Sequence, residues 1–507
     1  MVAVLETSAV QDVENLDGFA VFPDAEVVVS AAESTNWFDD SLPEPSAKAV
    51  IPVQIGAHHL HADGIDGRGV TLAVADTGYW RYHGLSRNSI GNKRVLAQYD
   101  AFDDRVIEQN GNGVTDDFNG HGSHVAGIAL NSNRIGDRPE GVAPGADLVS
   151  VRAFDADGRS TYGVLLRAIQ WVTEHTDTYG IRVLNLSFTA PPVGLYWEDP
   201  LARAVMEAWR QGIVVVTSAG NLGPRPMSIG VPGNVPYVIT VGAWTDNFTP
   251  DVLDDDRLAS FSSAGPTLEG ALKPELIAPG GHVLSVVKWF ARLAVDNPDR
   301  RQYPFHFSIS GTSQAAAVVS GAAALLLQAQ PELTPDEVKC KLVLSARAAR
   351  TDNGSMAYSI FQQGAGLLDV AAARAVTPTC GSFGLDIDAD LDGTRHFMGP
   401  ARQDSDGNFV VEGWNGMVWD GSYSSTDMFP WTDMFPWTDM FPWTDMFPWT
   451  DMFPWTDMFP WTDNDSSASD GTPVAAGPGY GWDRDRRGDR PQGRDGFVGP
   501  PTWVDEE

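Results

Sequence analysis

The run Val70-Thr-Leu-Ala-Val-Ala75, followed by Asp76-Thr-Gly78, is the clearest indication of the fold in this chain. Its continuous apolar character, with β-branched residues, is typical of a strand that is buried on both faces. Four later runs share the pattern: Leu148–Ala153, Val183–Leu186, Ile213–Val216 and Val238–Val241. Helical stretches lie between or after them, at Thr161–Glu174, Leu201–Gln211 and Ser313–Gln328. This alternation predicts an α/β fold, a three-layer sandwich in which helices cover a mostly parallel sheet.

The α/β pattern occupies residues 51–375, and sequence of a different character flanks it on both sides. Residues 1–50 form an acidic leader that ends in a proline-marked linker. Residues 376–425 are rich in Asp, Gly and Trp and show no helical period. The segment 426–463 contains six unbroken copies of Thr-Asp-Met-Phe-Pro-Trp, whose regular proline excludes a helix or a long central strand. We expect the irregular repeat tail, including the acidic end at 464–507, to be largely disordered.

Composition excludes several classes of protein. The formal net charge of the 507 residues is −33, of which −9 falls in residues 1–50, −7 in 51–375 and −17 in 376–507. Binding to nucleic acid or to an anionic membrane needs clustered Lys and Arg, so we expect neither partner. No apolar run reaches the roughly 18 residues of a transmembrane segment. The first 30 residues contain no basic residue, so the layout of a secretory signal is not visible.

Four polar residues stand where chemistry is expected. Asp76 closes the first apolar strand, at the carboxyl edge where parallel sheets place their active sites, although such an acid is more often a turn or capping residue. His121 opens a glycine-rich run that allows close approach to its imidazole, as a general base requires. The alternative for His121 is a capping histidine, and we expect His124, one turn later, to be structural.

Ser313 and Asn221 complete this set. Ser313 begins an Ala- and Leu-rich helix, where a serine is most often only the N-cap. As a nucleophile it would have the helix dipole beside the negative charge that develops in acyl transfer. Asn221 follows the strand Ile213–Val216, and its amide could donate to an oxyanion. Taken alone it would be an ordinary loop asparagine.

Taken together, three sequence blocks resemble the catalytic blocks of the subtilisin-like serine proteases, the subtilases: Asp76-Thr-Gly78, His121-Gly-Ser-His-Val-Ala-Gly127 and Gly311-Thr-Ser313. Further matching blocks are Gly141–Pro144, Val183–Ser187, Ala219–Asn221, Phe261–Thr267 and Ala278–Gly280, so the resemblance covers about residues 51–375. It implies a serine endopeptidase acting on proteins or peptides, without a cofactor in the chemistry. Ser313 would be the nucleophile, His121 its base, Asp76 the residue that orients the imidazole, and Asn221 an oxyanion donor.

The resemblance also implies where substrate binds. An extended peptide would pair as an added strand with Ser187, Phe188 and Thr189, near Ala219 and Gly220. Subtilases usually have Ser-Leu-Gly where this chain has Ser-Phe-Thr, so its specificity is expected to differ. Gln314 stands where the family usually has Met, which would make the site less sensitive to oxidation there. Ala317 replaces a proline that is common in the nucleophile helix.

Several features remain open to two interpretations. Asp388, Asp390 and Asp392 resemble the first half of a calcium loop, but the twelfth position is Gly399 instead of Glu. Subtilases often carry structural calcium, and the acidic stretch Asn110–Asp117 is a second weak candidate. The residues His58, His59 and His61 could bind a metal, although an exposed polar turn fits them better. A disulfide between Cys340 and Cys380 would be expected only outside the reducing cytosol.

The two ends of the chain leave the biological role open. Phe22–Ser30 resembles the end of a subtilase propeptide, which inhibits the site until it is cut, and a solvated acidic leader is the alternative. Such a propeptide would accompany a secreted or cell-surface protein. The Phe and Trp residues of the repeats suit surface adhesion or self-association, or the repeats are an unselected spacer. Two rival functions follow: an adhesion protein that carries a secondary or silent peptidase domain, and a maturation protease dedicated to one partner.

Overall fold

The structure is a computed structural model that describes residues 22, 24–29, 50–107, 116–192, 194–246, 256–350, 355–413, 418–422 and 502–505. Its centre is a nine-stranded sheet in the order β13-β12-β11-β9-β2-β7-β3-β4, in which β14 also pairs with β12. The strands are β2 (Thr71–Asp76), β3 (Val95–Asp100), β4 (Arg105–Val106), β7 (Asp147–Arg152), β9 (Ile181–Leu186), β11 (Val214–Ser218), β12 (Ile239–Thr245), β13 (Arg257–Leu258) and β14 (Leu276–Pro279). The pairs from β3 across to β12, and β12 with β14, are parallel, and only the short edge strands β4 and β13 pair antiparallel.

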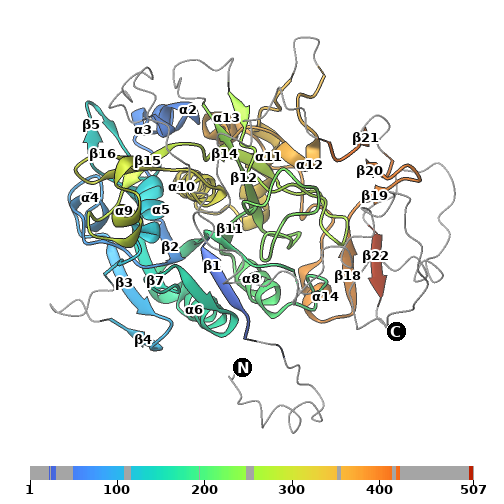
Figure 1. The fold of residues 1–507 in the computed structure, drawn as a ribbon, viewed down its shortest axis with the longest axis horizontal. Coiled ribbons are helices and arrows are strands. Elements are labelled where there is room, and N and C mark those ends of the chain that lie inside the picture. Colours follow the sequence, from blue (N-terminus) through green and yellow to red (C-terminus); the bar gives the residue numbers. More distant parts are fainter. Residues whose placement is uncertain are drawn as a thin grey trace, which may run out of the picture.

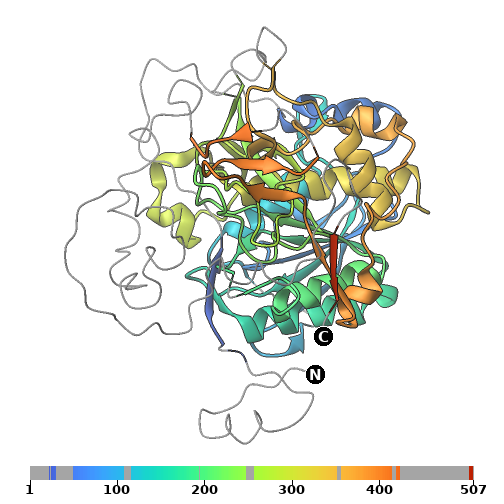
Figure 2. The same ribbon diagram turned by 90° about the vertical axis from the view of Figure 1, so that its right-hand side faces the viewer.

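Helices cover both faces of this sheet, as Figures 1 and 2 show from two directions. On one face α6 (Tyr162–Glu174) and α8 (Pro200–Arg210) pack against each other and on β2 and β11. On the other face α10 (Thr312–Ala329) packs on β9, β11 and β12 and beside α5 (His121–Leu130). The expected three-layer α/β sandwich is therefore confirmed. The five strands inferred from apolar runs and the three helices are all present, with ends shifted by at most a few residues.

Helix α10 is the central element of the core. Its side chains are apolar or small and buried through most of its length, and Gly321 lies so close to α5 and Val142 that an added Cβ would be 2.6 Å from the Val142 Cβ. Among the described residues it is the one helix long and apolar enough to cross a bilayer, yet 89% of it is buried inside the protein. Here it is a core helix whose first turn carries Ser313.

Shorter elements surround these layers. The helices are α2 (Ile51–Gln54), α3 (Ala57–Ala62), α4 (His83–Ser86), α7 (Thr176–Tyr179), α9 (Arg292–Asp296), α11 (Pro335–Ser345), α12 (Ile360–Gln363) and α13 (Val370–Ala375). Two hairpin regions are β5 (Arg134–Ile135) with β6 (Arg138–Pro139), and β15 (Val283–Val286) with β17 (His306–Ile309) and β16 (Arg301–Tyr303). Helix α11 is tied to the following segment by a disulfide between Cys340 and Cys380.

The described residues between 376 and 422 are more ordered than their composition indicates. They form α14 (Ile387–Leu391), β18 (Arg395–Met398) and the sheet of β19 (Ala401–Gln403), β20 (Phe409–Val411) and β21 (Val418–Trp419). Phe409 and Trp419 pack with Phe361 of the main domain in a separate apolar cluster. The repeats lie outside the described residues, and of the chain after 422 only β22 (Thr502–Asp505) is described, paired with β18.

Candidate active site

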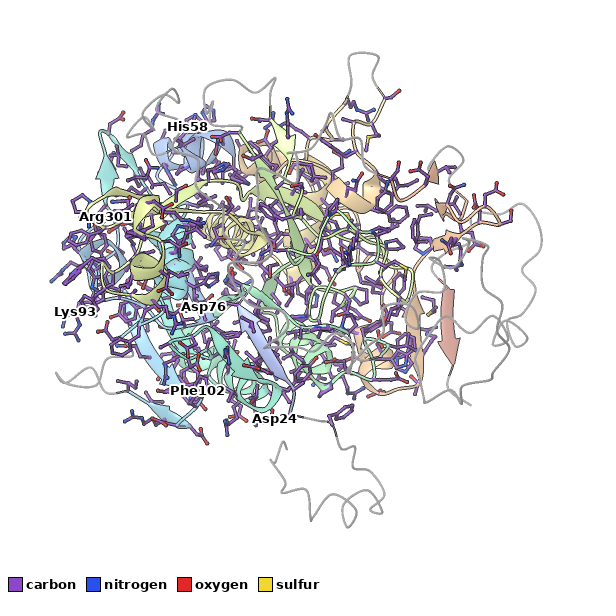
Figure 3. The ribbon with its side chains drawn as sticks, in the orientation of Figure 1. Asp24, His58, Asp76, Lys93, Phe102 and Arg301 are labelled. Atoms are coloured by element: carbon purple, nitrogen blue, oxygen red, sulfur yellow. A yellow bond between two sulfur atoms is a disulfide. The ribbon has the colours of Figure 1, made fainter. Side chains whose placement is uncertain are left out.

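Asp76 and His121 meet at the carboxyl edge of the sheet. Asp76 is the last residue of β2, and His121 is the first residue of α5. The His121 Nδ1 lies 2.8 Å from Oδ1 and 3.0 Å from Oδ2 of Asp76, and both side chains are at most 1% exposed. Figure 3 labels Asp76 beside β2. An imidazole held in this way donates from Nδ1, which leaves Nε2 as the proton acceptor.

Glycines allow the two elements to approach so closely. An added Cβ on Gly122 would be 2.3 Å from the carbonyl oxygen of Gly78, which no side chain could tolerate. Gly120, just before the helix, has φ +105°, a left-handed conformation that favours glycine. The Gly-His-Gly block thus packs the start of α5 directly onto the end of β2.

Asp117 organises this junction, and the sequence interpretation missed its role. Its Oδ1 accepts hydrogen bonds from Thr77 Oγ1 (2.8 Å) and the Gly120 N–H (2.7 Å). Its Oδ2 accepts from both the N–H and the hydroxyl of Ser123, each at 2.7 Å. Thr77 Oγ1 in turn accepts from the Gly122 N–H at 2.8 Å. The fully buried carboxylate therefore ties the residue after Asp76 to the first turn of α5.

Ser313 lies in the first turn of α10, where backbone N–H groups have no partner within the helix. Its Oγ donates to the carbonyl oxygen of Ser187 at 2.9 Å, and Ser187 Oγ donates to the carbonyl of Ser313 at 3.0 Å. Asn185 Nδ2 supports the Ser187 hydroxyl at 2.9 Å. The His121 Nε2 is buried and has no hydrogen-bond partner within the described part of the chain. The serine hydroxyl and the imidazole acceptor are thus both positioned but not bonded to each other.

Asn221 lies beside the nucleophile helix. Its Oδ1 accepts from the backbone N–H of Thr312 at 3.0 Å and from the Thr312 hydroxyl at 2.9 Å. Because the oxygen faces these donors, the amide is oriented and its Nδ2 is directed elsewhere. The Gly220 N–H donates to the same threonine hydroxyl at 3.2 Å, and Gly220 has φ +106°. Thr312, the residue before Ser313, therefore holds both Asn221, the expected oxyanion donor, and Gly220, an expected substrate-binding residue.

The expected substrate strand is present and is already paired. Phe188–Thr189 forms β10, and the leader strand β1 (Glu26–Val29) lies antiparallel between β10 and β8 (Arg159–Thr161). The partners are Val28 with Thr189 and Val29 with Phe188 on one side, and Val28 with Arg159 on the other. Ala219, on the far side of this region, donates its N–H to Val241 in the sheet.

Contacts other than strand pairing also hold the leader strand in place. Val27 is 1% exposed and belongs to the main core. The Asp24 Oδ1 accepts from the Gly163 N–H at 2.7 Å, at the N-terminus of α6, and Figure 3 labels Asp24 at that end of the molecule. The position beside the strand Phe188–Thr189 is therefore occupied by a segment of the chain's own N-terminal region.

The remaining histidines do not join this site. His124 Nε2 donates to the carbonyls of Val283 (3.2 Å) and Phe307 (3.1 Å), and burial lowers its pKa to about 3, so it is a neutral structural residue as expected. His58, His59 and His61 lie on α3, not in the expected exposed turn, and Figure 3 shows His58 far from Asp76.

The metal candidates do not converge. Asp388 and Asp390 lie on α14 with Asp392 just after it, and Asp390 is fully buried against tyrosines. Of the acidic stretch Asn110–Asp117, residues 110–115 lie outside the described residues, Asp116 pairs with Lys288, and Asp117 has the role given above. The described ranges contain no group of three His, Cys, Asp or Glu side chains that could hold a metal ion.

Comparison with known proteins gives a consistent picture. Residues 67–366, more than half of the chain, match the sequence model of the family described as the subtilase family, Peptidase_S8. The serine protease AprX of Bacillus subtilis is 38% identical over 282 residues, which cover 54% of this chain and 60% of AprX. Subtilisin DY of Bacillus licheniformis is 32% identical over 324 residues, 63% of this chain and 96% of that protein.

A solved structure has the same fold. Fervidolysin from Fervidobacterium pennivorans, described as a keratinolytic enzyme related to subtilisin, matches with a TM-score of 0.51 and 23% identity, covering 70% of this chain and 51% of fervidolysin. The chain thus spans less than two thirds of AprX and about half of fervidolysin, but nearly all of subtilisin DY.

Proposed function

The chain belongs to the subtilase family, and we propose that it is a serine endopeptidase that hydrolyses peptide bonds through an acyl-enzyme. The observation that carries this proposal is the buried Asp76–His121 pair, whose Nε2 has no partner among the described residues, at the edge of the sheet where α10 presents Ser313. A buried acceptor without a partner costs free energy, and a catalytic role is one reason for a protein to keep such a group.

In the proposed reaction, the Ser313 hydroxyl turns from the Ser187 carbonyl towards His121. Its Oγ attacks the substrate carbonyl carbon while Nε2 takes its proton, and the carbonyl oxygen becomes an oxyanion. Asp76 keeps the imidazole in the tautomer that accepts at Nε2 and stabilises the cation that forms. The Asn221 Nδ2 and the Ser313 N–H would donate to the oxyanion.

The intermediate then collapses. The imidazolium returns the proton to the leaving amine, the C–N bond breaks, and Ser313 remains as an ester. Water, deprotonated by the same imidazole, attacks this ester and releases the acid product with the free hydroxyl. Every step uses side chains, backbone N–H groups and water, so the proposed chemistry requires no cofactor.

A fluorophosphonate probe tests this activity, because it labels only an activated serine. We expect labelling of the parent and none of Ser313→Ala. Ser320→Ala is the matched control: it removes another buried serine of the same helix, leaves the site intact, and should be labelled like the parent. A folded parent, freed of its leader, that does not label would contradict the proposal and favour the silent carrier of an adhesion tail.

We also propose that the leader acts as an intramolecular inhibitor. Strand β1 uses the backbone groups of β10 and β8 with which an extended substrate would pair. The insertion of Val27 into the core and the contact of Asp24 with α6 support a specific complex. Cleavage after β1 would then open the site.

A synthetic peptide of residues 22–30 tests the leader. We expect it to inhibit the cleaved enzyme and to lose more than tenfold in affinity with Val27→Asp, since a buried charge would replace an aliphatic side chain. Glu26→Gln is the control, because the Glu26–Arg159 pair is 3.5 Å long and largely exposed. Equal inhibition by all three peptides would contradict a specific complex.

The protein is further proposed to act outside the cell. The Cys340–Cys380 disulfide supports this, because such bonds persist in oxidising compartments. Whether the enzyme digests many proteins or matures one partner is tested by cleavage of a peptide library: a spread of unrelated cut sites excludes a dedicated protease, and a single site within the repeats excludes general digestion.

A further inference from the structure

Two loops next to the substrate strand are joined to each other at one end. Ala190, directly after β10, exchanges two backbone hydrogen bonds with Val231, each of 2.8 Å. From this bridge, one loop runs on to Tyr196 and the other to Tyr237, just before β12. The bridge alone fixes only one end of the two loops.

Asp390 joins the other end. The hydroxyls of Tyr196 and Tyr237 both donate to its Oδ2, at 2.5 Å and 3.0 Å. Its Oδ1 receives a hydrogen bond of 2.7 Å from Nδ1 of His396, and Asp390 is 0% exposed. We call Asp390, Tyr196 and Tyr237 the Asp390 clamp. Burial, followed by the charge of Asp390, raises the pKa of both tyrosines, so each hydroxyl keeps its proton and remains a donor.

Two further hydrogen bonds hold Tyr196, one through its backbone N–H and one through its hydroxyl. Its N–H donates to Glu269 Oε1 at 2.7 Å, and its hydroxyl accepts from the Phe397 N–H at 3.0 Å. The clamp therefore connects three segments that are far apart in sequence, and the segment that supplies the carboxylate lies beyond residues 67–366 that match the family.

The two loops bear directly on the substrate strand. An added Cβ on Gly230 would be 3.0 Å from the Thr189 Cβ and 2.7 Å from the Ala190 oxygen. A Cβ on Gly220 would be 3.5 Å from Thr189 Oγ1, so the strand is packed against the residue before Asn221. Since Gly230 leaves no room for a side chain against Thr189 and Ala190, a shift of the loop that contains it should shift β10.

We propose that Asp390 is a positioning residue for substrate binding: by fixing Tyr196 and Tyr237, it holds β10 in the place where an extended peptide pairs with it. The C-terminal segment is then part of the peptidase unit and not a passive appendage. The kinetic part of this inference rests on the proposed endopeptidase function, whereas its structural part does not.

The kinetic test compares two substrates in the full chain after leader removal. One is an extended peptide that pairs with β10, and the other is a single-residue ester that does not reach it. For Asp390→Asn, at a temperature well below its unfolding transition, we expect the peptide KM to rise about tenfold, the peptide kcat to change less than threefold, and the ester kcat/KM to stay within twofold. Asp406→Asn, an exposed carboxylate of the same segment, should change neither substrate.

Tyr237→Phe is the milder variant, which removes one hydroxyl and keeps the ring, and it should raise the peptide KM about threefold. An unchanged peptide KM in both folded variants would overturn the proposal, as would an equal loss for peptide and ester. If Asp390→Asn does not fold, Tyr237→Phe alone decides.

Hydrogen exchange gives a readout without activity. In Asp390→Asn, amides of residues 186–197 should lose protection, whereas those of residues 70–80 should not. Exchange that is unchanged at 186–197 overturns the proposal. Suppose that the parent is not labelled by the probe and cleaves no substrate, yet Asp390→Asn shows the loss of protection at residues 186–197. This result would contradict the proposed function and leave the structural role of the Asp390 clamp supported.

Discussion

Within the described part of the chain, two buried Asp–His pairs have nearly the same geometry. In the candidate active site the Nδ1–Oδ1 distance between His121 and Asp76 is 2.8 Å, and in the C-terminal segment that between His396 and Asp390 is 2.7 Å. All four side chains are at most 4% exposed. Geometry within the pair therefore does not distinguish a catalytic site from a structural one.

The surroundings of the imidazole distinguish the two pairs. The imidazole of His121 keeps Nε2 buried and unbonded within the described residues, at the edge where Ser313 lies. The imidazole of His396 instead stacks on Trp197, with ring centroids 4.5 Å apart and an angle of 3°, and its carboxylate partner is also bound by two tyrosines. The first pair therefore keeps one ring nitrogen unbonded within the described residues, and the second closes a packed interface.

Replacing each histidine with alanine should give the largest difference in kcat between the two pairs. We expect His121→Ala to lower kcat by roughly 10⁶-fold, because the general base is lost, and to lower the free energy of unfolding by about 1–3 kcal/mol, because Asp76 loses a buried donor. His396→Ala should leave kcat within about tenfold and lower the free energy of unfolding by about 1–3 kcal/mol, because Asp390 loses a buried donor. Ester hydrolysis and urea unfolding of both variants measure this, and similar kinetic losses would refute the distinction.

The carboxylate of the active-site pair gives the next largest effect. Asp76→Asn keeps the size of the side chain but favours the imidazole tautomer with the proton on Nε2, so kcat should fall about 10⁴-fold. Loss of rate should be much smaller in Asp390→Asn with the same ester. Single-turnover acylation of the two variants provides the measurement, and a loss in Asp76→Asn below about tenfold would argue against its assigned role.

Asn221 sharpens the comparison because nothing in the Asp390 clamp corresponds to an oxyanion donor. Asn221→Ala should lower kcat by about 10²–10³-fold and leave KM nearly unchanged, since the donor acts mainly in the transition state. Steady-state kinetics with the extended peptide test this. A rise in KM at constant kcat would instead indicate that Asn221 only binds substrate.

The smallest expected effect is the pH dependence of stability that comes from Glu269, which accepts a hydrogen bond from the Tyr196 N–H. Burial raises the pKa of Glu269 above its ordinary value of 4.5. A carboxyl with a higher pKa in the folded than in the unfolded state favours folding at low pH, and this contribution is lost as the pH rises from about 4.5 through the folded pKa.

Glu269→Gln should therefore have a higher free energy of unfolding than the parent at neutral pH, and the difference should shrink below pH 4.5. Urea unfolding across this pH range provides the measurement. A Glu412→Gln control, at an exposed carboxylate, should show no such trend. A difference that is largest at low pH would show that the sign is wrong.

The central strands and the ends that carry the candidate residues could be predicted from sequence because their runs are continuously apolar. Strand β3 was not foreseen, since Val95–Asp100 includes Gln98 and Asp100 and pairs at the side of the sheet with a register shift. Asp117 was grouped with the acids before it as a weak metal candidate. Only the fold shows that its oxygens face the start of α5 and Thr77.

Asp390 illustrates the same limit. Its spacing with Asp388 and Asp392 suggested a calcium loop, but Asp388 and Asp390 lie two residues apart on the helix α14, so these two carboxylates lie on different faces of it. The partners of Asp390 at residues 196 and 237 could not be inferred from its neighbours. The roles of Asp76, His121, Ser313 and Asn221 stay predictions that the variants above decide.

The amino-acid order by itself determined the α/β class, the family blocks and which strand and helix ends present an acid, an imidazole and a hydroxyl, because these follow from local periodicity and short motifs. Tertiary structure alone decided that residues 26–29 pair with Phe188 and Thr189, and that a carboxylate beyond residues 67–366 receives hydrogen bonds from Tyr196 and Tyr237. The physical reason is that strand pairing and buried hydrogen bonds join groups that are distant along the chain, and no local pattern records which partners meet.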